Sequence, residues 1–203
     1  MQLPANSPDR RSDAILQSIR GMFAEKGFDG ASMQDLARAA GMSVGNFYRY
    51  FPSKAAIVEA IVNRDLNEVA QDFSEIMGAP DQLVALRGKL HERINLDLCG
   101  DDGPLWAEMT AAAFRKPEIA QATQRMETEI SRFMLAVFAR VTGQSDAEVA
   151  QRFSAHAGFI MLLIKSAATS VKMPVADESA LREMILRAID GVLSEIADSA
   201  VKG

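Results

Sequence analysis

The segment from Ser32 to Phe51 constrains the fold of this 203-residue chain most, because it has the pattern of two short helices joined by a tight turn. Apolar residues recur at Met33, Leu36 and Ala40, which is the spacing of one helix face. Gly41 follows, where a sharp reversal suits a residue with free access to positive φ. The pattern predicts a helix-turn-helix, with an ordinary helical hairpin as the alternative.

The second of these helices predicts a surface for DNA. Val44, Phe47 and Phe51 fall on its buried face, and Ser43 can cap its start. Its outward side chains are Ser43, Gly45, Asn46, Tyr48, Arg49 and Tyr50. Hydroxyl, amide and guanidinium groups bond to phosphates or base edges, and a glycine allows close approach. The alternative interpretation makes Tyr48 and Tyr50 core aromatics.

A third helix is predicted directly after this surface. Ser53 can cap it, Lys54 lies in its first turn, and Ile57 and Ile61 continue with helical spacing. A helix N-terminus that carries a lysine is a natural phosphate site.

The run from Ser32 to Lys54 closely resembles the DNA-binding end of TetR-family transcriptional regulators, and the match extends from Ile15 to about Ile61. The resemblance implies that Ser43, Val44, Gly45, Asn46, Tyr48 and Arg49 face the major groove or its flanking phosphates. It implies that Ser32, Met33, Tyr50 and Lys54 lie near backbone phosphates. Met33 and Asn46 depart from residues common in the family at these positions, and the second departure leaves the base preference open.

Helical spacing and turn residues predict an all-α chain. We expect a disordered leader (1–11), a three-helix helix-turn-helix DNA-binding domain (12–52) and a helical effector-binding and dimerisation bundle (53–203). The first helix covers about 12–26 and stops at Gly27. The later helices are expected at 53–77, 81–98, 104–114, 117–141, 145–172 and 177–199.

Charge divides unevenly along the chain, whose net charge is −5. Residues 1–64 carry +2 and the remainder −7, which favours nucleic acid as a partner at one end. The single cysteine, the lack of a signal peptide and the lack of a membrane-length apolar run favour a cytoplasmic protein. No catalytic motif, metal-spaced Cys/His cluster or cofactor loop occurs, so we expect neither an enzyme nor a metal or cofactor site.

The last two helices predict a dimer. The final helix has an unbroken apolar stripe, and the helix before it is apolar on more than one side, so both need cover. The expected interface residues are Phe153, Ile160, Ile164, Leu181, Ile185, Ile189, Val192 and Ile196. A two-fold four-helix interface satisfies this need and is the usual dimer of the family that the chain resembles; burial within one protomer is the alternative.

Candidates for an effector pocket come from aromatic and methionine side chains in the middle of the chain. They are Trp106, Met109, Phe114, Met126, Phe133, Met134, His156 and Phe159. Methionines make a cavity adaptable, but the same residues also suit an ordinary core.

Together these features predict a homodimeric regulator, a repressor in its simplest form, that binds a palindromic double-stranded DNA operator and is released by a small apolar effector. Two alternatives stay open. One is an effector-independent or protein-partnered DNA binder, which a fully packed core would favour. The other is a helical enzyme or ligand carrier with a vestigial DNA module. The sequence names neither the effector nor the operator nor the regulated genes, and it does not separate repression from activation.

Overall fold

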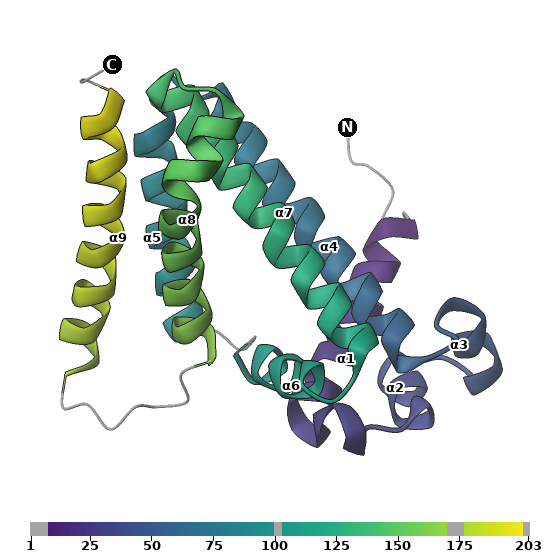
Figure 1. Cartoon of the computed structure of the whole chain (residues 1–203). Coiled ribbons are helices and arrows are strands. Elements are labelled where there is room, and N and C mark those ends of the chain that lie inside the picture. The colour runs from purple at the N-terminus through teal and green to yellow at the C-terminus, as the bar shows by residue number, and fades with distance from the viewer. Residues whose placement is uncertain (1–7, 100–102, 170–176, 201–203) are drawn as a thin grey trace, which may run out of the picture. The chain divides into compact units, whose positions relative to one another are not determined.

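The computed structural model describes residues 8–99, 103–169 and 177–200. Over these residues every regular element is an α-helix, which confirms the all-α prediction (Figure 1). The helices are α1 (Pro8–Gly30), α2 (Met33–Ala39), α3 (Val44–Tyr50), α4 (Lys54–Gly78), α5 (Gln82–Cys99), α6 (Gly103–Ala113), α7 (Pro117–Thr142), α8 (Asp146–Thr169) and α9 (Glu178–Ala200).

Glycine and proline set the ends of several helices. Gly27 has a φ of 73° and interrupts α1, so that a short last turn follows it. Gly143 has a φ of 68° and follows the last residue of α7. Pro117 is the first residue of α7, where its missing N–H has no intrahelical partner to lose. Helix α1 begins at Pro8 rather than at residue 12, so residues 8–11 of the expected leader are helical, while residues 1–7 lie outside the described part.

The helices form two compact units, which we call unit 1 and unit 2. Unit 1 comprises the described residues of 1–64 together with 104–123. Its core includes large apolar side chains from α1, α2, α3, α4 and α6: Ile19, Phe23, Phe28, Leu36, Phe47, Ile57, Ile61, Leu105 and Met109. Helices α2 and α3 are too short to be stable alone, so most of their stability comes from packing on the longer helices.

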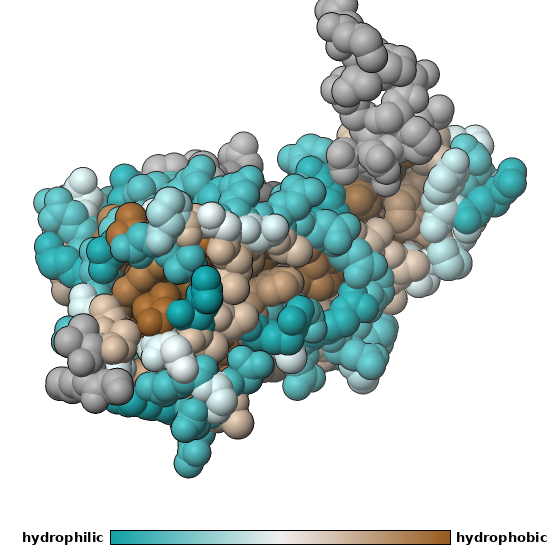
Figure 2. Space-filling model, turned by 90° about the horizontal axis from the view of Figure 1, so that it is seen from above, coloured by the Kyte–Doolittle hydropathy of each residue, from teal (hydrophilic) through white to brown (hydrophobic). Residues whose placement is uncertain are grey.

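Unit 2 comprises the described residues of 65–103 and 124–203. Helix α5 packs against both α8 and α9, and α8 also packs against α9. These three helices lie side by side in Figure 1. Their core joins Leu86 and Ile94 of α5 to Phe153 of α8 and Leu193 of α9. Viewed end-on, this unit exposes some hydrophobic side chains, in brown, between hydrophilic ones, in teal (Figure 2).

The two units do not coincide with the domain boundary expected between residues 52 and 53, because α6 and the first turns of α7 group with the N-terminal helices. The N-terminal module therefore includes a segment that lies far away in sequence. The described helices include none with the length and hydropathy of a membrane span.

Candidate nucleic-acid interface

Ser32 and Asp35 fix the start of α2 through a reciprocal cap. The Ser32 hydroxyl oxygen accepts from the Asp35 backbone N–H at 3.1 Å, and Asp35 Oδ2 accepts from the Ser32 N–H at 3.1 Å and from the Ser32 hydroxyl at 2.7 Å. These bonds from Ser32, aided by Lys26 at 3.1 Å, lower the pKa of the Asp35 carboxyl to about 2. The Ser32 hydroxyl is thus committed to the helix start, a role that differs from the expected phosphate contact.

The turn between α2 and α3 follows the geometry that the sequence predicts. Gly41 has a φ of 64°, and the Met42 N–H donates to the Ala37 carbonyl at 2.9 Å. Such left-handed backbone with an N–H directed back to the preceding helix is a glycine-dependent C-terminal cap. Ser43 then caps α3, where its hydroxyl oxygen accepts from the Asn46 N–H at 3.4 Å.

Two aromatic side chains anchor α3 to unit 1. Phe47 is fully buried and Phe51 is nearly so, and their ring centroids lie 5.3 Å apart. The seven-residue helix is too short to be stable alone, so this anchor holds it in place.

The opposite face of α3 is exposed. Tyr48 is 47% exposed and Tyr50 is 65% exposed, and Val44, which the sequence predicts on the buried face, is also exposed at 40%. Asn46 and Arg49 are exposed, and a Cβ added at Gly45 would meet nothing within 4 Å. Hydroxyl, amide and guanidinium groups therefore stand together on one short helix, with space for a ligand backbone to approach closely.

The structure gives Lys54 a different environment from the one expected. Its ammonium donates to the carbonyl oxygens of Phe28 at 2.7 Å and Asp29 at 3.1 Å, and it lies 5.4 Å from the centre of the Phe28 ring. Partial burial lowers the pKa of Lys54. The ammonium is thus occupied inside unit 1, because the carbonyls at the end of α1 come within its reach. Met33, expected beside a phosphate, is half-buried on α2.

The expected pocket residues occupy different environments. In unit 1, Met109 is buried, Trp106 is half-buried and Phe114 is 87% exposed. In unit 2, Met134 is buried and Phe159 is exposed. The other three are half-buried: Met126, Phe133, which stacks on Phe73 at 5.3 Å, and His156, whose Nε2 lies 3.2 Å from Glu195. The effector pocket therefore stays a prediction.

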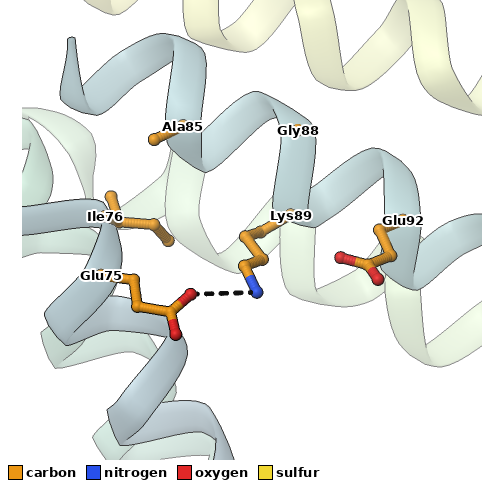
Figure 3. A pocket seen from close by; sticks show the side chains of 6 residues that line it. All are labelled: Glu75, Ile76, Ala85, Gly88, Lys89 and Glu92. Carbon is orange, nitrogen blue, oxygen red and sulfur yellow. Dashed lines mark ion pairs between the residues drawn. The ribbon is translucent and has the colours of Figure 1, made fainter. Parts of the chain in front are cut away.

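A hollow in unit 2 lies between α4 and α5 and involves none of those candidates. Its volume is about 280 Å³, and it is lined by Glu75, Ile76, Ala85, Gly88, Lys89 and Glu92 (Figure 3). The Lys89 ammonium lies 2.6 Å from Asp72 and 3.5 Å from Glu75, and the Asp72 bond raises its pKa. Gly88, a glycine inside a helix, is a sequence signal for the side of this hollow that α5 forms. No sequence signal identifies the side that α4 forms. The described residues contain no group of three or more metal-ligating side chains.

The residues expected at a dimer interface mostly face inward. Phe153, Ile160, Ile189 and Ile196 are buried in the core of unit 2, and Ile164, Ile185 and Val192 pack half-buried against it. Leu181 is also half-buried. The buried four cannot meet a second chain as the fold stands, because α5 covers the apolar stripes of both α8 and α9. The exposed large apolar residues of α8 and α9 are instead Phe159, Leu162 and Met184.

A capped α2, a left-handed glycine turn and an exposed polar helix together define a helix-turn-helix module. Residues 15–61 match the family model described as bacterial regulatory proteins, tetR family. The match covers the helix-turn-helix module, which is the part of the chain that is similar to tetR-family regulators.

Two curated relatives are similar over more than half of the chain. The HTH-type transcriptional regulator UidR of Escherichia coli (strain K12) is 29% identical over 124 residues, which cover 59% of this chain and 60% of UidR. The HTH-type transcriptional repressor Rv1474c of Mycobacterium tuberculosis is 32% identical over 122 residues, covering 56% of this chain and 62% of the relative. The chain thus spans about 60% of the length of these relatives.

Solved structures share the fold over nearly the whole chain. Salmonella enterica GusR has a TM-score of 0.69 at 24% identity and covers 94% of this chain and 98% of its own. AibR in complex with isovaleryl coenzyme A and operator DNA has a TM-score of 0.62 at 18% identity, with coverages of 91% and 97%. These likenesses show that the chain shares the fold of these structures, its C-terminal helices included.

Proposed function

We propose that this protein is a homodimeric, ligand-responsive transcriptional regulator, a repressor in its simplest form, that binds a palindromic operator through α2 and α3. The observation that carries the proposal is the division of α3 into two faces. Phe47 is buried in unit 1, while Tyr48, Asn46 and Arg49 are exposed beside it. A group of exposed aromatic side chains indicates a surface that a partner covers. A duplex fits them, because phosphates and base edges accept and donate hydrogen bonds.

The residues take different roles in this proposal. Ser43, Val44, Gly45, Asn46, Tyr48 and Arg49 face the major groove or its flanking phosphates. Met33 and Tyr50 lie at the edge of that surface, near the backbone. Ser32 and Lys54 support this surface without contacting DNA, because the Ser32 hydroxyl caps α2 and the Lys54 ammonium bonds the end of α1.

A second copy of the chain is the proposed cover for α8 and α9. Leu162 is 59% exposed on α8 and Met184 is 60% exposed on α9, and Phe159 lies one turn before Leu162. Gly158 and Gly191 have open space where a Cβ would be, which permits close approach of helices. A two-fold interface of four helices suits such a surface. It also holds two recognition helices at the roughly 34–36 Å spacing of successive major grooves.

The effector is the least specified part of the proposal. A small ligand acts by population shift only if it binds one arrangement of the protein better than the other. AibR supports the idea, since it is a chain of this fold described with both isovaleryl coenzyme A and operator DNA. The second candidate function is an effector-independent or protein-partnered DNA binder, which a fully packed core without a cavity would favour.

Selection of duplexes from a random DNA pool tests the DNA-binding proposal without knowledge of the operator. We expect the full chain to enrich a palindrome whose half-sites lie about 10 base pairs apart, centre to centre. Sedimentation should give a dimer at micromolar concentration, and Leu162→Glu should convert it to a monomer and abolish cooperative half-site binding. A control variant, Val84→Glu, changes an equally exposed side chain on α5 and should leave the dimer intact. A monomeric wild-type chain that enriches no duplex at low salt contradicts the proposal.

A further inference from the structure

The last turn of α1 is held by side chains from two distant parts of unit 1. The Phe28 N–H donates to Glu108 Oε2 of α6 at 3.2 Å. The Asp29 carboxylate accepts from Arg115 at 3.2 Å and pairs with Lys116 at 3.1 Å, both in the turn between α6 and α7. We call Phe28, Asp29, Lys54, Glu108, Arg115 and Lys116 the α1 clasp.

The Phe28 ring forms the centre of the clasp. It is buried, stacks on Phe23 with centroids 5.3 Å apart, and has the ammonium groups of Lys54 at 5.4 Å and Lys116 at 5.6 Å from its centre. Cations near an aromatic ring are attracted to its face. The Lys54 ammonium also bonds the Phe28 and Asp29 carbonyls, so one short turn is fixed through its ring, its N–H, its carbonyls and its carboxylate.

Gly27 makes this arrangement possible. Its φ of 73° breaks α1 before Phe28, and a Cβ at this position would lie 3.0 Å from Glu108 Oε2. The break lets the Phe28 N–H leave the helix ladder and point at Glu108 instead. The clasp is therefore built into the backbone as well as the side chains.

The clasp lies directly before the helix-turn-helix module. Ala31 donates its N–H to the Gly27 carbonyl, and Ser32 caps α2 immediately afterwards. A single residue, Ala31, separates the last turn of α1 from the cap of α2.

We propose that Asp29, Glu108, Arg115 and Lys116 are positioning residues for DNA binding, which hold the last turn of α1, and with it the start of α2, in the orientation in which α3 meets the duplex. This inference rests on the proposed DNA-binding function. It assigns to these charges a role in orientation rather than in contact with phosphates.

Asp29→Asn separates orientation from electrostatics. The substitution removes both ion pairs with little change of shape, and it makes the protein more positive. Electrostatics alone predicts tighter binding to DNA. The clasp predicts weaker binding to the selected duplex, by about 2- to 30-fold, with the slope of log Kd against log salt unchanged. Tighter or unchanged binding overturns the proposal.

Variants of Glu108 and Lys116 supply matched controls. Glu108→Gln keeps an oxygen that can accept from the Phe28 N–H and should keep the affinity, whereas Glu108→Ala should lose it and speed amide exchange at Phe28 by about tenfold or more. Lys116→Arg should retain binding. Lys116→Ala should weaken it without the slope change of about 0.9 that loss of a phosphate contact produces; such a slope change overturns the assignment.

The two hypotheses fail differently. If the wild-type chain enriches no duplex, the DNA-binding function fails, while amide exchange over residues 27–32 still tests the clasp. If the wild-type chain binds and the Ala variants change neither affinity nor exchange, the clasp has no positioning role. Thermal unfolding of each variant identifies any loss that arises from general instability.

Discussion

Phe47 and Tyr48 are adjacent in sequence, and their opposite exposure predicts opposite consequences of substitution. Phe47 is fully buried beside Phe51, so Phe47→Ala removes a whole aromatic ring from the core of unit 1. Large-to-small substitutions of buried phenylalanine cost about 3–5 kcal/mol in free energy of unfolding. Small domains have a total stability of about 5–15 kcal/mol, so α3 should detach or unit 1 should unfold at ordinary temperature.

Tyr48→Ala should have almost the reverse effect. The side chain is 47% exposed, and surface substitutions usually change the free energy of unfolding by within about 0.5 kcal/mol. The proposed contact with DNA is worth about 1–3 kcal/mol of binding free energy. Affinity for the selected duplex should therefore fall by about 5- to 150-fold while the protein stays folded and dimeric.

Urea unfolding and fluorescence anisotropy on a labelled duplex measure the two quantities separately. A conservative control, Phe47→Leu, should lose less stability than Phe47→Ala and keep DNA binding in the folded fraction. The reasoning about α3 is refuted if Tyr48→Ala binds the duplex as wild type does, or if it unfolds as readily as Phe47→Ala.

Three further predictions concern the surroundings of α3. Gly27→Ala should lower the free energy of unfolding by about 1–3 kcal/mol, because a left-handed φ and a contact of 3.0 Å with Glu108 both oppose a Cβ. The control Gly21→Ala, at a position with open space and no positive φ, should be neutral or stabilising in the same thermal unfolding experiment. Asp35 has its pKa lowered to about 2, so its contribution to the free energy of unfolding is complete above about pH 4 and disappears as the pH falls towards 2. The difference in urea midpoint between wild type and Asp35→Asn should therefore shrink over that range. A constant difference would contradict the cap. Lys54→Ala should lower the melting temperature and leave the salt dependence of DNA binding unchanged, because its ammonium bonds two carbonyls; a smaller salt slope would restore the phosphate role expected from the sequence.

The helix-turn-helix module could be predicted from the sequence because its determinants are local. Gly41 and Ser43 act within four residues of their own position, through a left-handed turn and a cap. Local hydrogen bonds of this kind are visible as residue types at fixed spacing. Over the described residues the helix bounds agree to within four residues for the same reason, while the expected helical residues 170–172 lie outside the described part.

The role of Lys54 could not be predicted in this way. A lysine at a helix start suits a phosphate equally well, and only the fold brings the Phe28 carbonyl within 2.7 Å of it. Similarly, helical spacing identifies the apolar stripe of α9 but not its neighbour. The structure places α5 against that stripe, so Ile189 and Ile196 become protomer core.

The pocket candidates follow from residue type, which indicates a capacity to line a cavity but not a shared location. Met109 is buried in unit 1, Met134 is buried in unit 2 and Phe114 is almost fully exposed. Side chains from several helices define a cavity, so its prediction requires the packing angles that a single sequence does not encode locally.

The two faces of α3 have a consequence for the history of such proteins. Since the anchor at Phe47 and Phe51 is separate from the outward positions, substitutions at residues 45, 46, 48 and 49 can accumulate without endangering the scaffold. A duplicated gene can therefore acquire a new set of target promoters through a handful of surface changes. The same separation makes this helix a suitable place to graft a different DNA preference by design.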